Sequence, residues 1–239
     1  MTFHVLIRAR NAEKYIGKCL RRLIKQSHTD WTALVALDAT TDNTAKVVES
    51  YHDERIRCMV SPKHLGVAQN MLTGLHAMRF LFQSDEDVAA IYDGDDWLDN
   101  DALHKVARTY RKYPDTLVTY GSYVKYSKGR KSKVSKPYPD GADVVTHTWR
   151  GSHLKTFKLH LVDHLKETMF LDNEGKWLQG ASDLALMIPI MQLAGLDRCH
   201  HISKPIYFYR DNARGKTDRK LQKQCEKIVR GKPRLERLK

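Results

Sequence analysis

Short apolar runs alternate with segments of helical periodicity along the first hundred residues. Apolar side chains dominate four runs that are typical of strands, at residues 3–8, 31–37, 55–60 and 88–92. Between them, apolar side chains recur every three or four positions, as on a helix with one buried face, at residues 12–27 and 66–82. This alternation predicts an α/β fold built from βαβ units, with a mostly parallel central sheet flanked by helices.

Beyond residue 98 the pattern predicts helices at 99–112, 153–170 and 182–194, and strands at 117–123 and 204–209. Residues 124–141 are basic and rich in Gly, Pro and Ser, which predicts a mobile loop, either folded over an anionic ligand or simply solvated. The residues from 213 onward suit a basic helix or a disordered tail, and the pattern does not decide between them.

Charge adds a preference for anionic partners. The chain of 239 residues is 41% hydrophobic, which suits one compact domain, and its formal net charge is +13. Residues 213–239 alone hold 11 Lys and Arg against 3 Asp and Glu, a net +8. An anionic membrane surface is therefore a candidate partner for the tail, whereas nucleic acid is disfavoured because no aromatic residues are interleaved with the basic run.

The cysteines and the N-terminus bear on the compartment. Four cysteines are widely spaced without a Cys-x-x-Cys pair, which disfavours a disulfide scaffold or a zinc site. The first ten residues hold no apolar signal segment, and the longest uncharged stretch, 184–196, is too short to span a bilayer. We expect a cytoplasmic protein that can lie peripherally at a membrane.

The densest chemical signal is Asp93-Gly94-Asp95-Asp96, directly after the apolar run that ends at Tyr92. Ligands of an open α/β sheet bind at the carboxyl ends of its strands. Crowded carboxylates repel one another unless a proton or cation compensates, and oxygen ligands suit Mg²⁺ or Mn²⁺. A turn that leads into a helix cap is the alternative interpretation of the same residues.

Two further polar segments follow predicted strands. Asp38 ends the second strand and is placed to accept hydrogen bonds from a nucleobase or ribose, whereas Thr41 or Asp42 could simply cap the next helix. Gly66 lets the backbone approach a ligand before the helix that carries Asn70.

In chain order these segments form a set of six: IRARN (7–11), LDATTDNT (37–44), HLGVAQN (64–70), YDGDDWLD (92–99), GASDLAL (180–186) and YFYR (207–210). The set resembles the inverting family-2 glycosyltransferases of the GT-A fold. The resemblance implies a Rossmann-like GT-A domain over 1–212, with a nucleotide-sugar half over about 1–100, an acceptor half over 101–212, and a basic tail over 213–239.

The resemblance also implies roles for single residues. Nucleotide-sugar contacts fall on Ala9, Arg10, Asn11, Asp38, Gly66, Asn70, Asp93, Gly94, Asp95 and Arg210. Asp95, assisted by Asp93, would hold Mn²⁺ or Mg²⁺ against the leaving diphosphate. Asp183 would be the general base that deprotonates the acceptor hydroxyl, although an N-cap of the following helix is the structural alternative.

Acceptor contacts are expected from a helix over 149–164, at Trp149, His153 and Lys155, with a glycan or glycolipid as acceptor. Trp97 is expected to pack on the sheet rather than against a sugar. The chain departs from the family pattern at Leu37 and Ala39, where the family has Asp and Gly. It also has Asp211-Asn212 where many members have a metal-binding His, so water, His153 or His201 would complete the metal shell.

The leading hypothesis is a metal-dependent inverting glycosyltransferase that moves a hexose or deoxyhexose from a nucleotide-diphosphate sugar to a hydroxyl. The alternative is a basic protein that binds nucleic acid or a membrane surface and carries a non-catalytic glycosyltransferase-like domain. If the tail is only an anchor, truncation after Asn212 should spare transfer.

Overall fold

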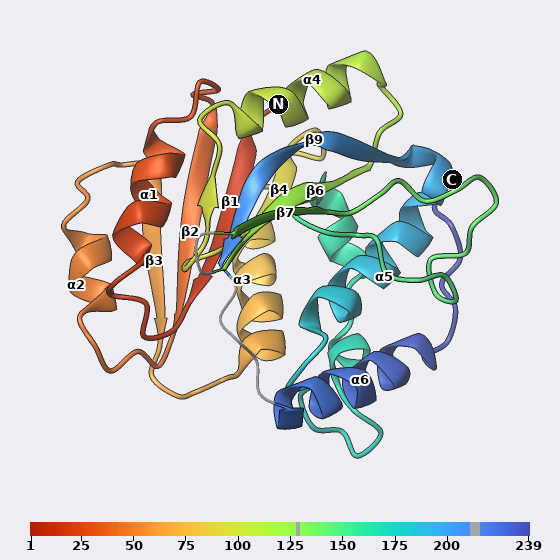
Figure 1. Cartoon of the computed structure of the whole chain (residues 1–239). Helices are drawn as coiled ribbons and strands as arrows, with labels where there is room; N and C mark the ends of the chain where they lie inside the picture. The colour runs from red at the N-terminus through yellow and green to blue at the C-terminus, as the bar shows by residue number, and fades with distance from the viewer. Residues whose placement is uncertain (128–129, 211–215) are drawn as a thin grey trace.

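The structure is a computed structural model that describes residues 1–127, 130–210 and 216–239. A single mixed sheet runs through it in the order β3-β2-β1-β4-β8-β6-β9-β5, with β7 paired to β6 (Figure 1). Its strands are β1 (Phe3–Ala9), β2 (Trp31–Asp38), β3 (Ile56–Ser61), β4 (Val88–Asp93), β5 (Trp97–Leu98), β6 (Val118–Ser127), β7 (Arg130–Val134), β8 (Lys155–Lys158) and β9 (Cys199–Arg210).

The first half is the parallel part that the pattern predicts. β1 pairs in parallel with β2 and with β4, and β2 pairs in parallel with β3. The helices between these strands are α1 (Ile16–Ile24), α2 (Thr44–Glu49) and α3 (Val67–Leu81). The four predicted strands, the two predicted helices and the α/β class are confirmed.

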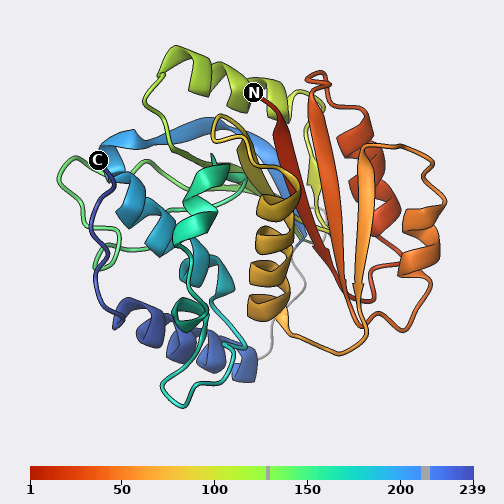
Figure 2. The ribbon, with the colours of Figure 1, turned by 180° about the vertical axis from the view of Figure 1, so that it is seen from behind.

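Helices cover both faces of the sheet. On one face, Phe3, Val5 and Ile7 pack with α1 and α4 (Ala102–Lys112). On the other, Leu6 and Leu34 pack with α3, α5 (Ser182–Ala194) and the C-terminal α6 (Lys216–Arg230), and Figure 2 shows α3 in front of the sheet. Alternation along β1 therefore divides the core into two layers, as expected for a sheet covered on both sides.

The helix predicted over 153–170 is wrong. Residues 155–158 form β8, antiparallel to both β4 and β6, and two 3₁₀ helices follow, η1 (Leu159–His164) and η2 (Glu167–Phe170). All four residues of β8 are buried, including Lys155 and Lys158. A strand buried on both faces shows no alternation, and two lysines inside it remove the apolar run that would mark it.

The segment 124–141 also differs from the expected loop. β6 continues to Ser127, and β7 pairs antiparallel with it over residues 130–134. Lysine-rich composition suggests a loop, but lysine is also common on edge strands, where it discourages pairing with other chains. The basic side chains of residues 127–134 lie outside the described part of the chain, so their expected contact with an anion stays a prediction.

The C-terminal segment is packed onto the domain. Cys225 and Val229 of α6 are buried in the same core layer as α5, and Leu235 and Leu238 pack against that layer. Figures 1 and 2 both show α6 at the lower end of the molecule, beneath α5. The sequence pattern left a basic helix and a disordered tail open for this segment. In the structure, residues 216–230 form a helix.

Candidate functional site

The carboxyl ends of β1, β2 and β4 meet at one edge of the sheet. The Cα atoms of Arg8 and Asp93 are register partners, and so are those of Ala9 and Leu37, one residue before Asp38. Parallel strands thus bring three segments of the sequence pattern to the edge where open α/β sheets bind ligands.

Gly94 allows the turn after β4 to lie against the end of β1. Its N–H donates to the Arg8 carbonyl at 2.9 Å. A Cβ at this position would lie 2.8 Å from the Ala9 Cβ and 3.1 Å from the Arg8 carbonyl oxygen. The glycine in the acidic motif is therefore required by packing, which is the reason the turn can present the carboxylates beside it.

Arg8 joins the two predicted functional carboxylates. Its guanidinium makes a close ion pair with Asp93 Oδ1, and its Nη2 lies 3.6 Å from Asp183 Oδ1. Its side chain is only 11% exposed. Asp183 stands in the first turn of α5, so Arg8 connects the end of β1, the acidic motif after β4 and the start of α5 in one cluster.

Lys155 brings a second buried cation to the same place. Its Nζ lies 3.0 Å from Asp183 Oδ2, and its side chain is 1% exposed. It also contacts His153 Nδ1 at 3.1 Å, and the His153 ring stacks on Tyr207 of β9 with centroids 4.5 Å apart. Two of the three predicted acceptor residues therefore lie beside the predicted base.

The charges in this cluster control its protonation. Burial would raise the pKa of Asp183, but Lys155 and Arg8 outweigh it and hold that pKa well below its usual range. Burial, which favours the neutral ring, and the adjacent Lys155 lower the pKa of His153 to about 3. At neutral pH the cluster thus holds an ionised Asp183 and an uncharged His153.

Asp96 is buried and anchors β9 to the acidic motif. Its carboxylate accepts from the Tyr207 hydroxyl at 2.6 Å and from the Arg210 N–H at 2.7 Å. Burial, together with the charges of Asp93 and Asp95, raises the pKa of Asp96 to about 8. Negative charge is therefore crowded at this turn, which is a condition that a bound cation relieves.

A metal at this turn would need ligands from the substrate. Among the described residues, no three His, Cys, Asp or Glu side chains gather closely enough to hold an ion. Mg²⁺ is commonly bound by one or two carboxylates together with waters and substrate phosphates, so the partly exposed Asp95 beside Asp93 fits such a site. His153 is stacked on Tyr207 and bonded to Lys155, a setting that suits packing better than metal binding.

Asp38 organises a turn instead of standing open at the strand end. Its carboxylate accepts from His64 Nδ1 at 2.8 Å, from the Leu65 N–H at 2.6 Å and from the Gly66 N–H at 3.0 Å. Gly66 has φ +80°, a conformation that suits glycine. His64, half exposed and paired to Asp38, was missed by sequence reasoning, and its position two residues before the glycine is the signal that could have found it.

The remaining residues predicted to contact the nucleotide sugar lie in two places, the end of β1 and the helix α3. Ala9 is buried, whereas Arg10 and Asn11 are exposed, and Asn11 Oδ1 accepts from the Thr41 N–H at 2.8 Å. Asn70 is buried and donates to the Ala36 carbonyl at 3.1 Å, so it ties α3 to β2 away from the open edge.

The backbone of Arg210 is bonded to the acidic motif, whereas its guanidinium and the side chains of Trp97 and Trp149 make other contacts. The Arg210 guanidinium lies 3.5 Å from the centroid of the Tyr15 ring, just before α1. Trp97 stacks on Phe208 of β9, as the packing interpretation expects. Trp149 packs against the core layer of α3 and α5 and closely approaches Gly151, so the structure does not bring it to Lys155.

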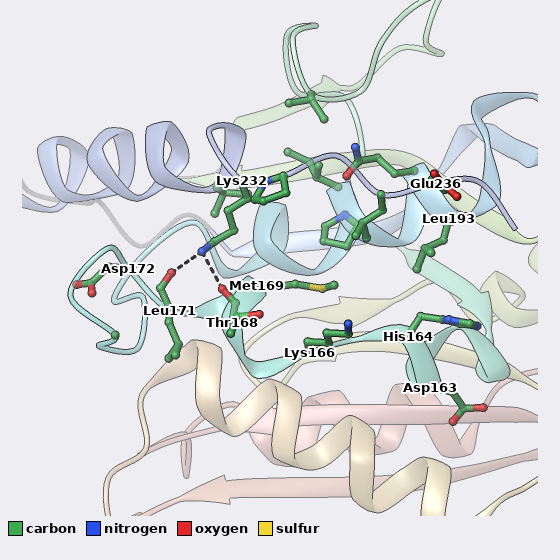
Figure 3. A pocket seen from close by; sticks show the side chains of 18 residues that line it. Asp163, His164, Lys166, Thr168, Met169, Leu171, Asp172, Leu193, Lys232 and Glu236 are labelled. Carbon is green, nitrogen blue, oxygen red and sulfur yellow. Dashed lines mark hydrogen bonds between the residues drawn. The ribbon is translucent and has the colours of Figure 1, made fainter.

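A cavity of about 670 Å³ lies away from this cluster (Figure 3). It is bounded by η1 and η2, the C-terminal half of α5 and residues 229–236, and none of the predicted site residues lines it. The Lys232 side chain forms part of the cavity wall, and its Nζ donates to the Thr168 and Leu171 carbonyls, both at 2.8 Å. The cluster at the sheet edge, with its paired charges, is the better candidate for chemistry.

Within the described residues, no helix combines the length and apolar character needed to cross a membrane. This bears only on the helices and leaves contact with a membrane surface to be tested.

Comparisons with known proteins agree with the fold. The structure resembles that of Staphylococcus aureus TarS in complex with UDP, with a TM-score of 0.67 and 20% identity over 89% of this chain and 61% of the other. TarS in complex with UDP-GlcNAc gives a TM-score of 0.69 over 90% of this chain and 60% of that one, again at 20% identity.

Sequence relatives point the same way. Streptococcus pneumoniae glycosyltransferase GlyA is 21% identical over 65% of this chain and 23% of its own length. Escherichia coli chondroitin synthase is 26% identical over 45% of this chain and 15% of its own length. The chain spans between 15% and 44% of the length of the curated relatives it matches.

The model of glycosyl transferase family 2 matches residues 4–171, a range that includes β1 from His4 onward, the turn at Asp38 and the acidic motif after β4. The chain belongs to glycosyl transferase family 2.

Proposed function

We propose that the chain is a glycosyltransferase that moves a sugar from a nucleotide-diphosphate donor to a hydroxyl acceptor with inversion at the anomeric carbon. The observation that carries the proposal is the position of Arg8, whose guanidinium pairs with Asp93 and lies 3.6 Å from Asp183. This contact places the acidic motif and the start of α5 at one site, where a donor and its attacking hydroxyl could meet.

Asp183 is the proposed general base. Inversion needs a base on the face opposite the leaving group, and a carboxylate serves only when it is ionised. Lys155 and Arg8 keep Asp183 ionised, but they also weaken its basicity in the free protein. A bound diphosphate would add negative charge beside Arg8 and Lys155 and raise the pKa of Asp183 toward a range useful for proton transfer.

Asp95 and Asp93 are the proposed protein contribution to a divalent metal site, with Mg²⁺ or Mn²⁺ as the ion. The ion would supply a Lewis acid against charge that builds on the departing diphosphate. Because Asp93 is already paired with Arg8, Asp95 is the proposed direct ligand and Asp93 orients Arg8 at the site.

The nucleotide pocket is proposed between the turn at Arg10 and Asn11 and the turn that Asp38 holds. His64 is added to the predicted contacts there, because it is half exposed and fixed by Asp38. The TarS complexes with UDP and UDP-GlcNAc support a nucleotide sugar as the donor class. The division into a donor half over about 1–100 and an acceptor half over 101–212 remains part of this proposal.

A panel of UDP-, GDP- and dTDP-sugars tests the function directly. We expect the wild-type protein to release nucleoside diphosphate from one donor class in the presence of Mn²⁺ or Mg²⁺. Asp95→Ala should abolish that release, whereas the matched control Asp140→Ala, at an exposed aspartate away from the cluster, should retain it. Turnover that is equal in EDTA would contradict the metal proposal alone, and no turnover of any donor would contradict the enzyme.

A peripheral membrane contact is proposed for α6. Lys220, Lys223 and Lys227 are exposed at helical spacings of three and four, on the side opposite the buried Cys225 and Val229. A stripe of this kind suits anionic lipid headgroups. Replacing the three lysines by glutamine should abolish sedimentation with phosphatidylserine vesicles at low salt, and unchanged sedimentation would refute the contact.

A further inference from the structure

The turn that begins α5 is held from α6. Ala181 donates its backbone N–H to the side-chain oxygen Oε1 of Gln222 at 2.9 Å. The preceding residue, Gly180, lies so close to α6 that a Cβ there would be 3.2 Å from Gln222 Oε1 and 3.6 Å from Cys225 Sγ. A single side chain of α6 thus reaches the backbone immediately before the helix that carries Asp183.

This turn needs an external partner. Ala181 has φ +53°, in the left-handed region, which is unfavourable for a residue with a Cβ. It is 4% exposed, so its N–H would be buried without a partner if Gln222 were absent. The N-cap residue of α5 is Ala181 itself, whose side chain makes no capping hydrogen bond. Gln222 therefore satisfies a buried donor at the strained residue.

The same residue begins the hydrogen bonding of α5. The carbonyl of Ala181 accepts from the N–H groups of Leu184 and Ala185, both at 3.0 Å. Asp183 lies in this first turn, between Ala181 and Leu184, and its Oδ2 is 3.0 Å from Lys155 Nζ. A shift of Ala181 would therefore move Asp183 relative to Lys155 and Arg8.

The helix that supplies Gln222 is itself fixed. Cys225 and Val229 are buried beside α5. Arg230 donates to the backbone carbonyls of Val145 and His147. Beyond the helix, Leu238 N–H donates to the Leu193 carbonyl at 2.9 Å, at the far end of α5. The C-terminal segment consequently holds α5 at both ends.

We infer that Gln222 is a positioning residue for Asp183, acting through the backbone of Ala181. The inference rests on the proposed role of Asp183 as general base. It assigns the C-terminal segment a part in catalysis that is separate from its exposed lysines.

Three variants test the inference. Gln222→Met keeps the length of the side chain but removes the acceptor oxygen, whereas Gln222→Glu keeps an acceptor. Gln224→Ala, at an exposed glutamine on the opposite side of α6, is the matched control. Hydrogen exchange of the segment around Ala181 and the kinetics of nucleoside diphosphate release are measured on all three.

In Gln222→Met we expect hydrogen exchange around Ala181 to accelerate roughly fivefold or more, as loss of one buried hydrogen bond implies. We expect kcat to fall by about tenfold to a hundredfold with the KM for the nucleotide sugar little changed, because only the base is displaced. Gln222→Glu and Gln224→Ala should match the wild type in both measurements.

Exchange and kcat in Gln222→Met equal to those of Gln224→Ala would overturn the inference. So would a Gln222→Glu protein as slow as Gln222→Met, or a rise in KM without a fall in kcat. If the wild-type protein turns over no nucleotide sugar, the proposed function fails separately, and the exchange measurement still decides whether Gln222 holds the turn.

Discussion

Lys155 Nζ lies 3.0 Å from Asp183 Oδ2, so a lysine in the middle of the sheet is paired with the first turn of α5. Both belong to segments that sequence reasoning assigned to the acceptor side, but the pairing depends on β8 being a strand between β4 and β6. A buried cation with so little exposure persists only when it is paired. The contact therefore ties the architecture of the sheet to the protonation of the proposed base.

Replacing Lys155 by methionine should change the pH dependence of turnover. Loss of one adjacent cation lets burial raise the pKa of Asp183 toward its ordinary value. Because the base must be ionised, the acidic limb of the kcat profile should move to higher pH, by about one unit or more. The control is Lys158→Met, which lies on the same strand as Lys155 but breaks a different pair, the one with Glu86. It should leave the limb in place. A limb that moves to lower pH, or that both variants move equally, would contradict the assignment.

Replacing Asp183 by asparagine should separate catalysis from binding. The amide cannot accept the proton of the acceptor hydroxyl, so we expect kcat to fall by about a hundredfold to ten-thousandfold. The Kd for the nucleoside diphosphate should stay within a few-fold of the wild type, because the proposed nucleotide contacts lie on other elements. Titration calorimetry and steady-state kinetics on the same preparation provide both values. Retained kcat would contradict the role of Asp183 as the base.

Gly94→Ala should destabilise the protein and disturb the acidic motif. The new Cβ would lie 2.8 Å from the Ala9 Cβ, with backbone on its other side, so the turn must move. Overpacking of this kind costs about 1 to 3 kcal/mol. Urea unfolding measures the loss, and Gly231→Ala, whose added Cβ meets only ordinary contacts, is the control. Equal stability of the two variants would mean that the turn after β4 is looser than the structure indicates.

Truncation after Asn212 should cost stability as well as any membrane contact. It removes Cys225 and Val229 from the core layer around α5, and burying a Val side chain alone contributes about 1.5 kcal/mol or more. We therefore expect a lower unfolding midpoint and loss of turnover in the truncated chain. A truncated protein with the Tm and kcat of the full chain would restore the view of residues 213–239 as a detachable anchor.

The sequence pattern predicts the parallel half of the fold well, and physical reasons explain this. β1, β2 and β4 are short apolar runs, and α1 and α3 have clear periodicity, so local sequence and tertiary structure agree there. β8 could not be recognised, since Lys155 and Lys158 are kept in the interior by partners distant in sequence, Asp183 and Glu86. Periodicity contains no information about such partners.

In the site, too, local sequence patterns reveal some residues, whereas contacts between distant segments decide the others. Asp93, Asp95 and Asp183 stand at strand or helix ends, positions that local patterns reveal. Arg8 connects Asp93 with Asp183, yet within the strand pattern it is one polar residue among several. The hydrogen bond from the Ala181 N–H to Gln222 joins residues far apart in sequence, and nothing in the charge pattern of the C-terminal segment indicates it. Contacts of this kind emerge only when the packing of α6 on α5 is known.

A nucleoside diphosphate and a divalent metal are proposed to bind together at the edge formed by β1, β2 and β4. Isothermal titration with UDP, GDP and dTDP, each with Mn²⁺ and with EDTA, on the wild type, Asp95→Ala and Asp140→Ala, tests it most directly. We expect one nucleoside diphosphate to bind the wild type and Asp140→Ala with Mn²⁺, and we expect EDTA or Asp95→Ala to abolish binding. If the wild type bound none of the three nucleotides, or if Asp95→Ala bound as tightly as the wild type, the proposed site would be contradicted.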